Sequence, residues 1–207
     1  MEAMDSVYSL CCGRTCRWIT RRRAGLSVIL AVVALGNALW GEAEPWDLLG
    51  PDASPLWFLP WSLAFIGAGI RIWGAGNLRK NKEVTRTGIY RMVRHPLYLG
   101  NCLIYLAFLV SLDGLLLGTA LFLVLYAVHY PLVFQEEERL AREYPLEFEA
   151  WKETPRFLPN LLVFPEALAT DRFSLARVFQ NYGLRGLWAP VLLPVVTEAL
   201  AALRGYV

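Results

Sequence analysis

Long, nearly uninterrupted apolar stretches constrain this chain more than any other feature of its sequence. Four of them are clear, and a fifth near the C-terminus contains two prolines and a glutamate: Ala24–Trp40, Leu56–Leu78, Leu97–Leu112, Gly114–Phe134 and Gly186–Leu203. A helix needs about 20 residues to cross a bilayer. The second and fourth stretches meet this length, the first is marginal, and the third meets it if its helix begins near Pro96. The pattern predicts an all-α, polytopic integral membrane protein with about five transmembrane helices, the fifth of which either spans the bilayer or lies at its surface.

Composition supports this class and excludes others. Of the 207 residues, 56% are hydrophobic and 18% are charged, whereas soluble domains are about 45–50% apolar and about 25% charged. The net charge of +2 indicates no nucleic-acid partner. The four cysteines and two histidines have no zinc-site spacing, so we expect no metal. Cys11 and Cys12 lie beside a basic run and are candidates for acylation.

The positive charges are distributed unevenly between the connecting segments. Five arginines precede the first apolar stretch, and no convincing cleavage site follows it, so we expect a retained span rather than a signal peptide. The loop Glu42–Asp52 carries only acidic charges, whereas Arg79–Arg94 holds six basic residues against one acid, Glu83. Because basic loops stay on the cytoplasmic side, the N-terminus, the second loop and the segment after the fourth stretch are all predicted to be cytoplasmic.

The third and fourth stretches are separated by little more than Asp113 and Gly114, which predicts a tight antiparallel helical hairpin. Its two open ends begin with RMVRHPLYLG and finish with FQEEERL. The topology therefore brings these two polar segments face to face and predicts a pocket, facing the cytoplasm, that could bind a cofactor.

The basic end of this hairpin combines several features of an anion site. Pro96 suits the first turn of a helix, so Arg94 and His95 would lie at the positive helix terminus, where a carboxylate or phosphate is favoured. Tyr98 could stack on a purine, and Gly100 would let a flat ligand approach the backbone. The alternative is a membrane anchor in which the arginines bind lipid phosphates.

At the acidic end, three glutamates follow an apolar span. Glu137 falls on an inward-facing stripe at helical spacing, Glu136 lies at its edge and Glu138 is turned away. A carboxylate on such a stripe needs a cation or a ligand. The alternative to a ligand is a salt bridge to Arg91 or Arg94.

Three further polar residues fall within the apolar stretches, where such residues are often functional. His129 lies on the same helix face as the glutamates and is a candidate base. For Asn101 we favour an interhelical hydrogen bond between the hairpin arms. Arg71 is expected to extend along the helix to the membrane surface.

The motif GIYRMVRHPLYLG, followed by EEERLAREYPLEFEAW and TPRFLP, resembles the isoprenylcysteine carboxyl methyltransferase and phospholipid methyltransferase superfamily over Gly74–Pro159. The resemblance implies an S-adenosyl-L-methionine cofactor and methyl transfer to a lipophilic small molecule or a lipidated substrate. It also implies cofactor contacts from residues matching the family motif, namely Tyr90, His95, Pro96, Leu97, Tyr98, Gly100 and one of Glu136 and Glu137. A looser match places Lys82–Thr85 against the cofactor.

One departure from the family pattern bears on the substrate. Isoprenylcysteine methyltransferases carry an arginine one turn before the glutamates, and here VHYPLVFQEEE has none. The acceptor is therefore left open between a prenylcysteine-like carboxylate, a phospholipid and another membrane-soluble nucleophile. The membrane is left open between a bacterial inner membrane and the endoplasmic reticulum.

Two other functions remain as alternatives. An NADPH-dependent sterol or steroid reductase shares the RHP-Tyr-Gly element, but this chain has Leu97 and Asn101 where those proteins have an asparagine and an acid. The second alternative is a non-enzymatic membrane scaffold that binds anionic lipid through the basic loop. We expect one domain over 1–207, with N-terminal spans at 1–73, the cofactor-binding catalytic region at 74–160 and a C-terminal segment at 161–207.

Overall fold

The computed structural model describes residues 15–40, 58–80 and 82–205, and all regular secondary structure within these ranges is helical. This confirms the predicted all-α class. The long helices are α2 (Thr15–Trp40), α3 (Phe58–Asn77), α4 (Pro96–Glu143) and α8 (Trp188–Arg204). The short elements are η1 (Gly88–Arg91), α5 (Pro145–Trp151), η2 (Leu161–Val163), α6 (Phe164–Ala169), α7 (Leu175–Gln180) and η3 (Gly183–Leu187). Cys11, Cys12 and the acidic loop Glu42–Asp52 lie outside the described residues, so the predictions for them stay predictions.

Three segments are long and apolar enough to cross a membrane: Phe58–Asn77, Leu117–Glu143 and Gly183–Arg204. Two shorter apolar helices, Val28–Trp40 and Pro96–Leu112, accompany them. The structure thus supports a polytopic membrane protein. The sequence left open whether the C-terminal stretch spans the bilayer, and in the structure this stretch is a helical segment of spanning length. Large apolar side chains such as Phe65, Leu123 and Val195 are exposed on these helices, as expected of surfaces that face lipid.

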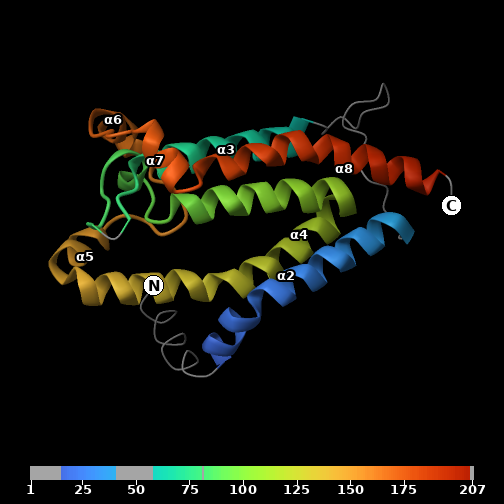
Figure 1. Cartoon of the computed structure of the whole chain (residues 1–207), viewed down its shortest axis with the longest axis horizontal. Coiled ribbons are helices and arrows are strands. Elements are labelled where there is room, and N and C mark those ends of the chain that lie inside the picture. Colours follow the sequence, from blue (N-terminus) through green and yellow to red (C-terminus); the bar gives the residue numbers. More distant parts are fainter. Residues whose placement is uncertain (1–14, 41–57, 81, 206–207) are drawn as a thin grey trace.

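The hairpin predicted at Asp113-Gly114 is present, although helical hydrogen bonding continues through it. In a straight helix, residues 42 positions apart would be about 63 Å apart, yet Nε2 of His95 and Oε1 of Glu137 approach within 3.0 Å. Figure 1 shows α4 folding back on itself into two arms. At the fold a Cβ on Gly118 would lie 2.3 Å from the carbonyl oxygen of Leu109, so the close approach of the arms there requires a glycine.

Small residues let α3, the first arm of α4 and α8 pack closely, as in many helical membrane proteins. Ala64, Ala107 and Leu193, one from each of these helices, form a fully buried cluster. Beside it, a Cβ on Gly67 would lie 2.7 Å from the carbonyl oxygen of Gly100, so the two backbones touch.

The two ends of the helical bundle differ. At one end Ala38, Leu112 and Leu200 join α2, the fold of α4 and α8 in an apolar cluster. At the other end the short elements and the segment between α3 and α4 gather around the open end of the α4 hairpin (Figure 1). The polar segments therefore lie together at one end of the molecule.

Candidate functional site

A cavity of about 390 Å³ lies where the open end of the α4 hairpin meets the C-terminal end of α3. Its walls come from four separate parts of the chain: α3 with the loop after it, the start of α4, the end of α4 with α5, and α7 with the residues that follow. The lining residues are Arg71, Leu78, Lys80, Glu83, Val84, Thr85, Tyr90, Arg94, His95, Pro96, Leu97, Tyr98, Asn101, Glu136, Arg139, Leu140, Trp151, Gln180, Asn181 and Tyr182.

The first turns of α4 form one wall. His95 occupies the N-cap position and Pro96 the first turn, as the sequence predicts, because the missing N–H of proline has no partner there in any helix. Leu97 and Asn101 are one helical turn apart and both line the cavity, as does Tyr98. The positive end of the helix dipole therefore lies beside the cavity.

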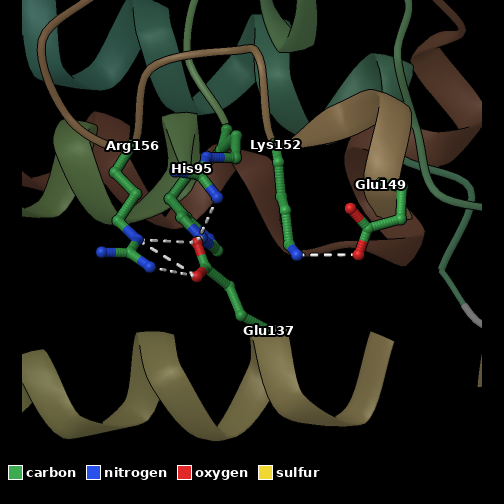
Figure 2. A network of polar contacts seen from close by, with 6 residues as sticks. His95, Glu137, Glu149, Lys152 and Arg156 are labelled. Atoms are coloured by element: carbon green, nitrogen blue, oxygen red, sulfur yellow. Dashed lines mark hydrogen bonds and ion pairs between the residues drawn. The ribbon is translucent and has the colours of Figure 1, made fainter. Parts of the chain in front are cut away.

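Glu137 is the centre of a buried ion cluster next to this wall. Only 5% of its surface is exposed, and its carboxylate is 3.0 Å from Nε2 of His95, 3.1 Å from Nη1 of Arg94 and 2.9 Å from Nη2 of Arg156. Figure 2 shows His95 and Arg156 converging on Glu137 from across the hairpin. Burial of a carboxylate is costly unless it is paired and hydrogen-bonded, and here both oxygens have partners.

Arg156 reaches this cluster because the TPRFLP segment is fastened along the residues before α4. The backbone N–H of Arg94 donates to Pro155 O at 2.8 Å, and that of Asn160 donates to Met92 O at 2.9 Å. Between these bonds Arg156 donates to Glu137 from Nε to Oε1 at 3.1 Å and from Nη2 to Oε2 at 2.9 Å. This forked geometry is the strongest arrangement of an arginine with a carboxylate.

The imidazole of His95 is fixed by both packing and hydrogen bonding. Ring centroids of Trp151, Tyr98 and Phe157 lie 5.3, 5.8 and 6.2 Å from that of His95. Because a carboxylate only accepts hydrogen bonds, Nε2 of His95 is the donor to Glu137. Trp151 also has a buried indole N–H that finds no hydrogen-bond partner within the described ranges. Other atoms of Trp151 line the cavity.

The loop before η1 packs against α5 and the C-terminal end of α4. The backbone N–H of Val84 donates to Oε2 of Glu147 in α5 at 2.9 Å, and Val84 packs with Phe148 and Trp151. Tyr90 of η1 is buried, and this burial, with the charge of Glu136 as a smaller cause, raises the pKa of Tyr90 above its ordinary value. Its phenol is therefore neutral at physiological pH.

Arg71 of α3 points into the cavity from within a membrane-spanning helix. Its Nη1 donates to Oδ1 of Asn101, and its Nη2 donates to the carbonyl oxygen of Tyr182 at 3.3 Å. The predicted interhelical hydrogen bond of Asn101 is present, but it joins α4 to α3 rather than the two arms of α4. Arg71 does not extend freely to the surface, contrary to the sequence prediction, because Asn101 and Tyr182 hold its guanidinium.

The C-terminal segment completes the cavity. Nδ2 of Asn181 donates to the carbonyl oxygens of Ala75 and Leu78 at 2.9 and 3.0 Å, and Nε of Arg177 donates to Gly76 O at 2.7 Å. These bonds satisfy carbonyls at the end of α3 that have no partner within the helix. They place Gln180, Asn181 and Tyr182 against the cavity.

The cavity brings together most residues predicted for the site and leaves three outside its lining. Tyr90, Arg94, His95, Pro96, Leu97, Tyr98 and Glu136 line it. Gly100 instead packs against Gly67 and Arg71, and Glu137 lies in the ion cluster behind the wall. His129 donates from Nδ1 to Leu125 O at 2.9 Å and lies beside Tyr105, away from the cavity lining.

Some lining and supporting residues were missed by sequence reasoning. Arg156 sits in the PRF motif, but nothing in the motif indicates that it pairs with Glu137. Arg71 was assigned to the membrane surface, and Asn181 and Tyr182 lie in the C-terminal segment, to which the sequence assigned no site residue. For Arg71, its position as a polar residue in an apolar stretch was a signal that could have indicated a functional role. The contacts of Arg156, Asn181 and Tyr182 arise from the tertiary fold and have no signal in the sequence.

Comparison with known proteins gives a family match and two curated relatives. Residues 55–147 match the phospholipid methyltransferase family. The cobalt-zinc-cadmium resistance protein CzcN of Cupriavidus metallidurans is 34% identical over 152 residues, which cover 71% of this chain and 68% of that protein. The nickel-cobalt-cadmium resistance protein NccN of Alcaligenes xylosoxydans xylosoxydans is 32% identical over 153 residues, covering 71% and 69%. No solved structure matches the chain significantly.

Proposed function

This chain belongs to the phospholipid methyltransferase family, and from that membership we propose that it transfers a methyl group from S-adenosyl-L-methionine to a lipophilic acceptor at the membrane surface. The observation that carries the proposal is the cavity at the start of α4, where His95, Tyr98 and Glu136 face one space. The basic segment before α4 lies at the same end of the molecule. From its charge we propose that this end faces the cytoplasm.

The chemistry of the cavity fits this cofactor. Its volume of about 390 Å³ lies within the range of small-molecule sites, about 300–1,000 Å³. The cofactor is a zwitterion with a carboxylate, an ammonium, a sulfonium and an adenine. The cavity offers the positive end of α4, the carboxylate of Glu136, and the rings of Tyr98 and Trp151.

We assign each residue a role in cofactor binding that agrees with its position and contacts. The start of α4 with Arg94 and His95 would hold the cofactor carboxylate, Glu136 the ammonium or the ribose, and Tyr98 the adenine. Glu137 acts as a positioning residue, because it orients His95 and Arg94 from behind the wall. Val84, Leu97 and Leu140 supply apolar surface that excludes water from the same space.

The reaction itself makes few demands on acid–base groups. The bound cofactor supplies a methyl group on a positively charged sulfur, which is already activated for displacement. The protein must then align the acceptor with that group and hold both in place, a contribution that can be large without any proton transfer. The position of His129 outside the cavity lining is compatible with this mechanism.

The printed names of both curated relatives refer to metal resistance. The described part of this chain contains no group of three His, Cys, Asp or Glu residues placed to hold a metal ion, so we do not propose metal binding as its activity. The match to the phospholipid methyltransferase family argues against the alternative of an NADPH-dependent reductase.

Binding of S-adenosylhomocysteine tests the proposal directly. We expect purified protein in neutral detergent to bind this demethylated product of the cofactor in calorimetry and not to bind NADPH. Glu136→Gln removes the carboxylate that faces the cavity and should weaken binding at least about tenfold, the loss expected for one charge-assisted hydrogen bond. Glu138→Gln is the matched control, because Glu138 is exposed and pairs with Arg142. Binding of NADPH but not of S-adenosylhomocysteine would establish the reductase instead.

A further inference from the structure

Arg71 carries a positive charge into the cavity from a membrane-spanning helix. It lies on α3, six residues before the helix ends at Asn77, and its side chain lines the deeper part of the cavity beside Asn101. Ionisable residues within spanning segments are costly in free energy, and they commonly mark a binding site or a transport path. The charge of Arg71 therefore requires a partner.

The partners of Arg71 in the protein are neutral. They are the side-chain oxygen of Asn101 and the backbone carbonyl of Tyr182. Within the described ranges, no carboxylate forms an ion pair with Arg71, whereas Arg94, the buried arginine of the site, is paired with Glu137. A guanidinium has five N–H donors, and these two hydrogen bonds use two of them. The cavity is therefore lined by a guanidinium that has no ion-pair partner among the described residues.

The position of Arg71 is fixed by the packing of its stem. A Cβ on Gly100 of α4 would lie 2.6 Å from Cγ of Arg71, and a Cβ on Gly186 of η3 would lie 3.0 Å from Cδ. Any larger residue at these two positions would displace the arginine. Two glycines on different elements thus leave space for the stem, and the guanidinium lines the cavity.

We propose that Arg71, held by Asn101, binds an oxyanion of the methyl acceptor, either a carboxylate or a phosphate. The inference rests on the proposed function and adds to it the chemical class of the acceptor. Arginine suits this task because its planar fork matches both groups. Asn101 follows His95 by six residues, or about 9 Å along the helix axis. The oxyanion subsite and the proposed cofactor subsite are therefore two regions of one cavity.

The test compares amphiphiles that share a chain and differ in the head group. Dodecanoate, dodecyl phosphate and the neutral dodecanol are titrated into the full-length protein in neutral detergent, with and without S-adenosylhomocysteine. We expect one or both anions to bind at least about tenfold more tightly than dodecanol, and the stronger anion identifies the head group. Arg71→Gln should abolish this preference and leave S-adenosylhomocysteine binding within about twofold of the wild-type value.

Two further variants make the result specific. Arg185→Gln is the matched control, because Arg185 is exposed, lies 4.1 Å above the ring of Tyr182 and does not line the cavity; it should keep the preference. Asn101→Asp places a carboxylate against the Arg71 guanidinium, so it should lose the preference even if Arg71→Gln fails to fold.

The outcomes separate this inference from the proposed function. Equal affinity of the wild type for the three amphiphiles, or an anion preference that survives both Arg71→Gln and Asn101→Asp, overturns the role of Arg71. An Arg71-dependent preference in a protein that binds no S-adenosylhomocysteine would leave the oxyanion subsite standing and reject the methyltransferase proposal.

Discussion

Glu137 shows how far a single residue can be predicted from a periodic pattern. Its place on an inward stripe, with Glu138 turned outward, follows from helical spacing and agrees with their exposures of 6% and 74%. The salt bridge to Arg94 was foreseen as the alternative to a ligand. The forked pairing of Glu137 with Arg156 could not be predicted, because that contact depends on how the loop at 152–160 folds back across the residues before α4.

The ion cluster leads to a prediction about stability. Glu137→Gln leaves Arg94 and Arg156 buried beside a neutral amide, which should cost about 3–5 kcal/mol of folding free energy, the usual loss when one member of a buried pair is removed. We expect a lower melting temperature in detergent together with loss of S-adenosylhomocysteine binding, because His95 and Arg94 lose their orientation.

Glu138→Gln provides the comparison for that experiment. Glu138 is exposed, and its contact with Arg142 is 3.5 Å long, so the substitution should change the melting temperature by about 1 °C or less, as is usual for exposed ion pairs. Equal melting temperatures for the two variants would show that the Glu137 cluster contributes no stability.

At the scale of the elements, the hairpin was predictable and its packing partners were not. Asp113-Gly114 between two apolar stretches indicates a reversal, and the contact between His95 and Glu137 confirms it. The spacing of residues in the sequence does not show that Gly67 faces Gly100, because the sequence does not indicate which residue a glycine in an apolar helix packs against. Gly100 was consequently predicted to face a ligand, whereas the structure places it against α3.

Two glycines on α3 allow the packing of α3 against α4 to be tested with one substitution. Gly67→Ala places a methyl group 2.7 Å from the carbonyl oxygen of Gly100, whereas Gly69 has no atom within 4 Å of the equivalent position. We expect Gly67→Ala to destabilise the protein by about 1–3 kcal/mol through overpacking. Gly69→Ala should be neutral or slightly stabilising, because alanine favours helix. Thermal unfolding in detergent measures both, and a neutral Gly67→Ala would show that the two helices separate readily at this point.

At the scale of the whole molecule, membrane class and the clustering of polar segments followed from the sequence. The apolar stretches predicted the long helices, and charge bias placed the basic loop and the acidic end of α4 on one side, as the structure has them (Figure 1). The contribution of α7 and the two residues after it to the cavity did not follow from the sequence. Asn181 and Arg177 act on carbonyls of α3 that are more than 100 residues earlier in the chain, and no local pattern encodes that pairing.

The orientation of the molecule gives the last prediction. The basic segment after α3 and the start of α3 lie at opposite ends of the bundle (Figure 1). If the positive charges keep the site in the cytoplasm, a cysteine at the site end is protected in intact cells and one at the far end is accessible. In a variant without the four native cysteines that is expressed in a bacterial inner membrane, Lys80→Cys should react with a membrane-impermeant maleimide only after permeabilisation, whereas Phe58→Cys should react before it. Both positions are exposed, so burial within the protein does not account for protection. Labelling of Lys80→Cys in intact cells would reverse the orientation and place the cavity outside the compartment that supplies S-adenosylmethionine.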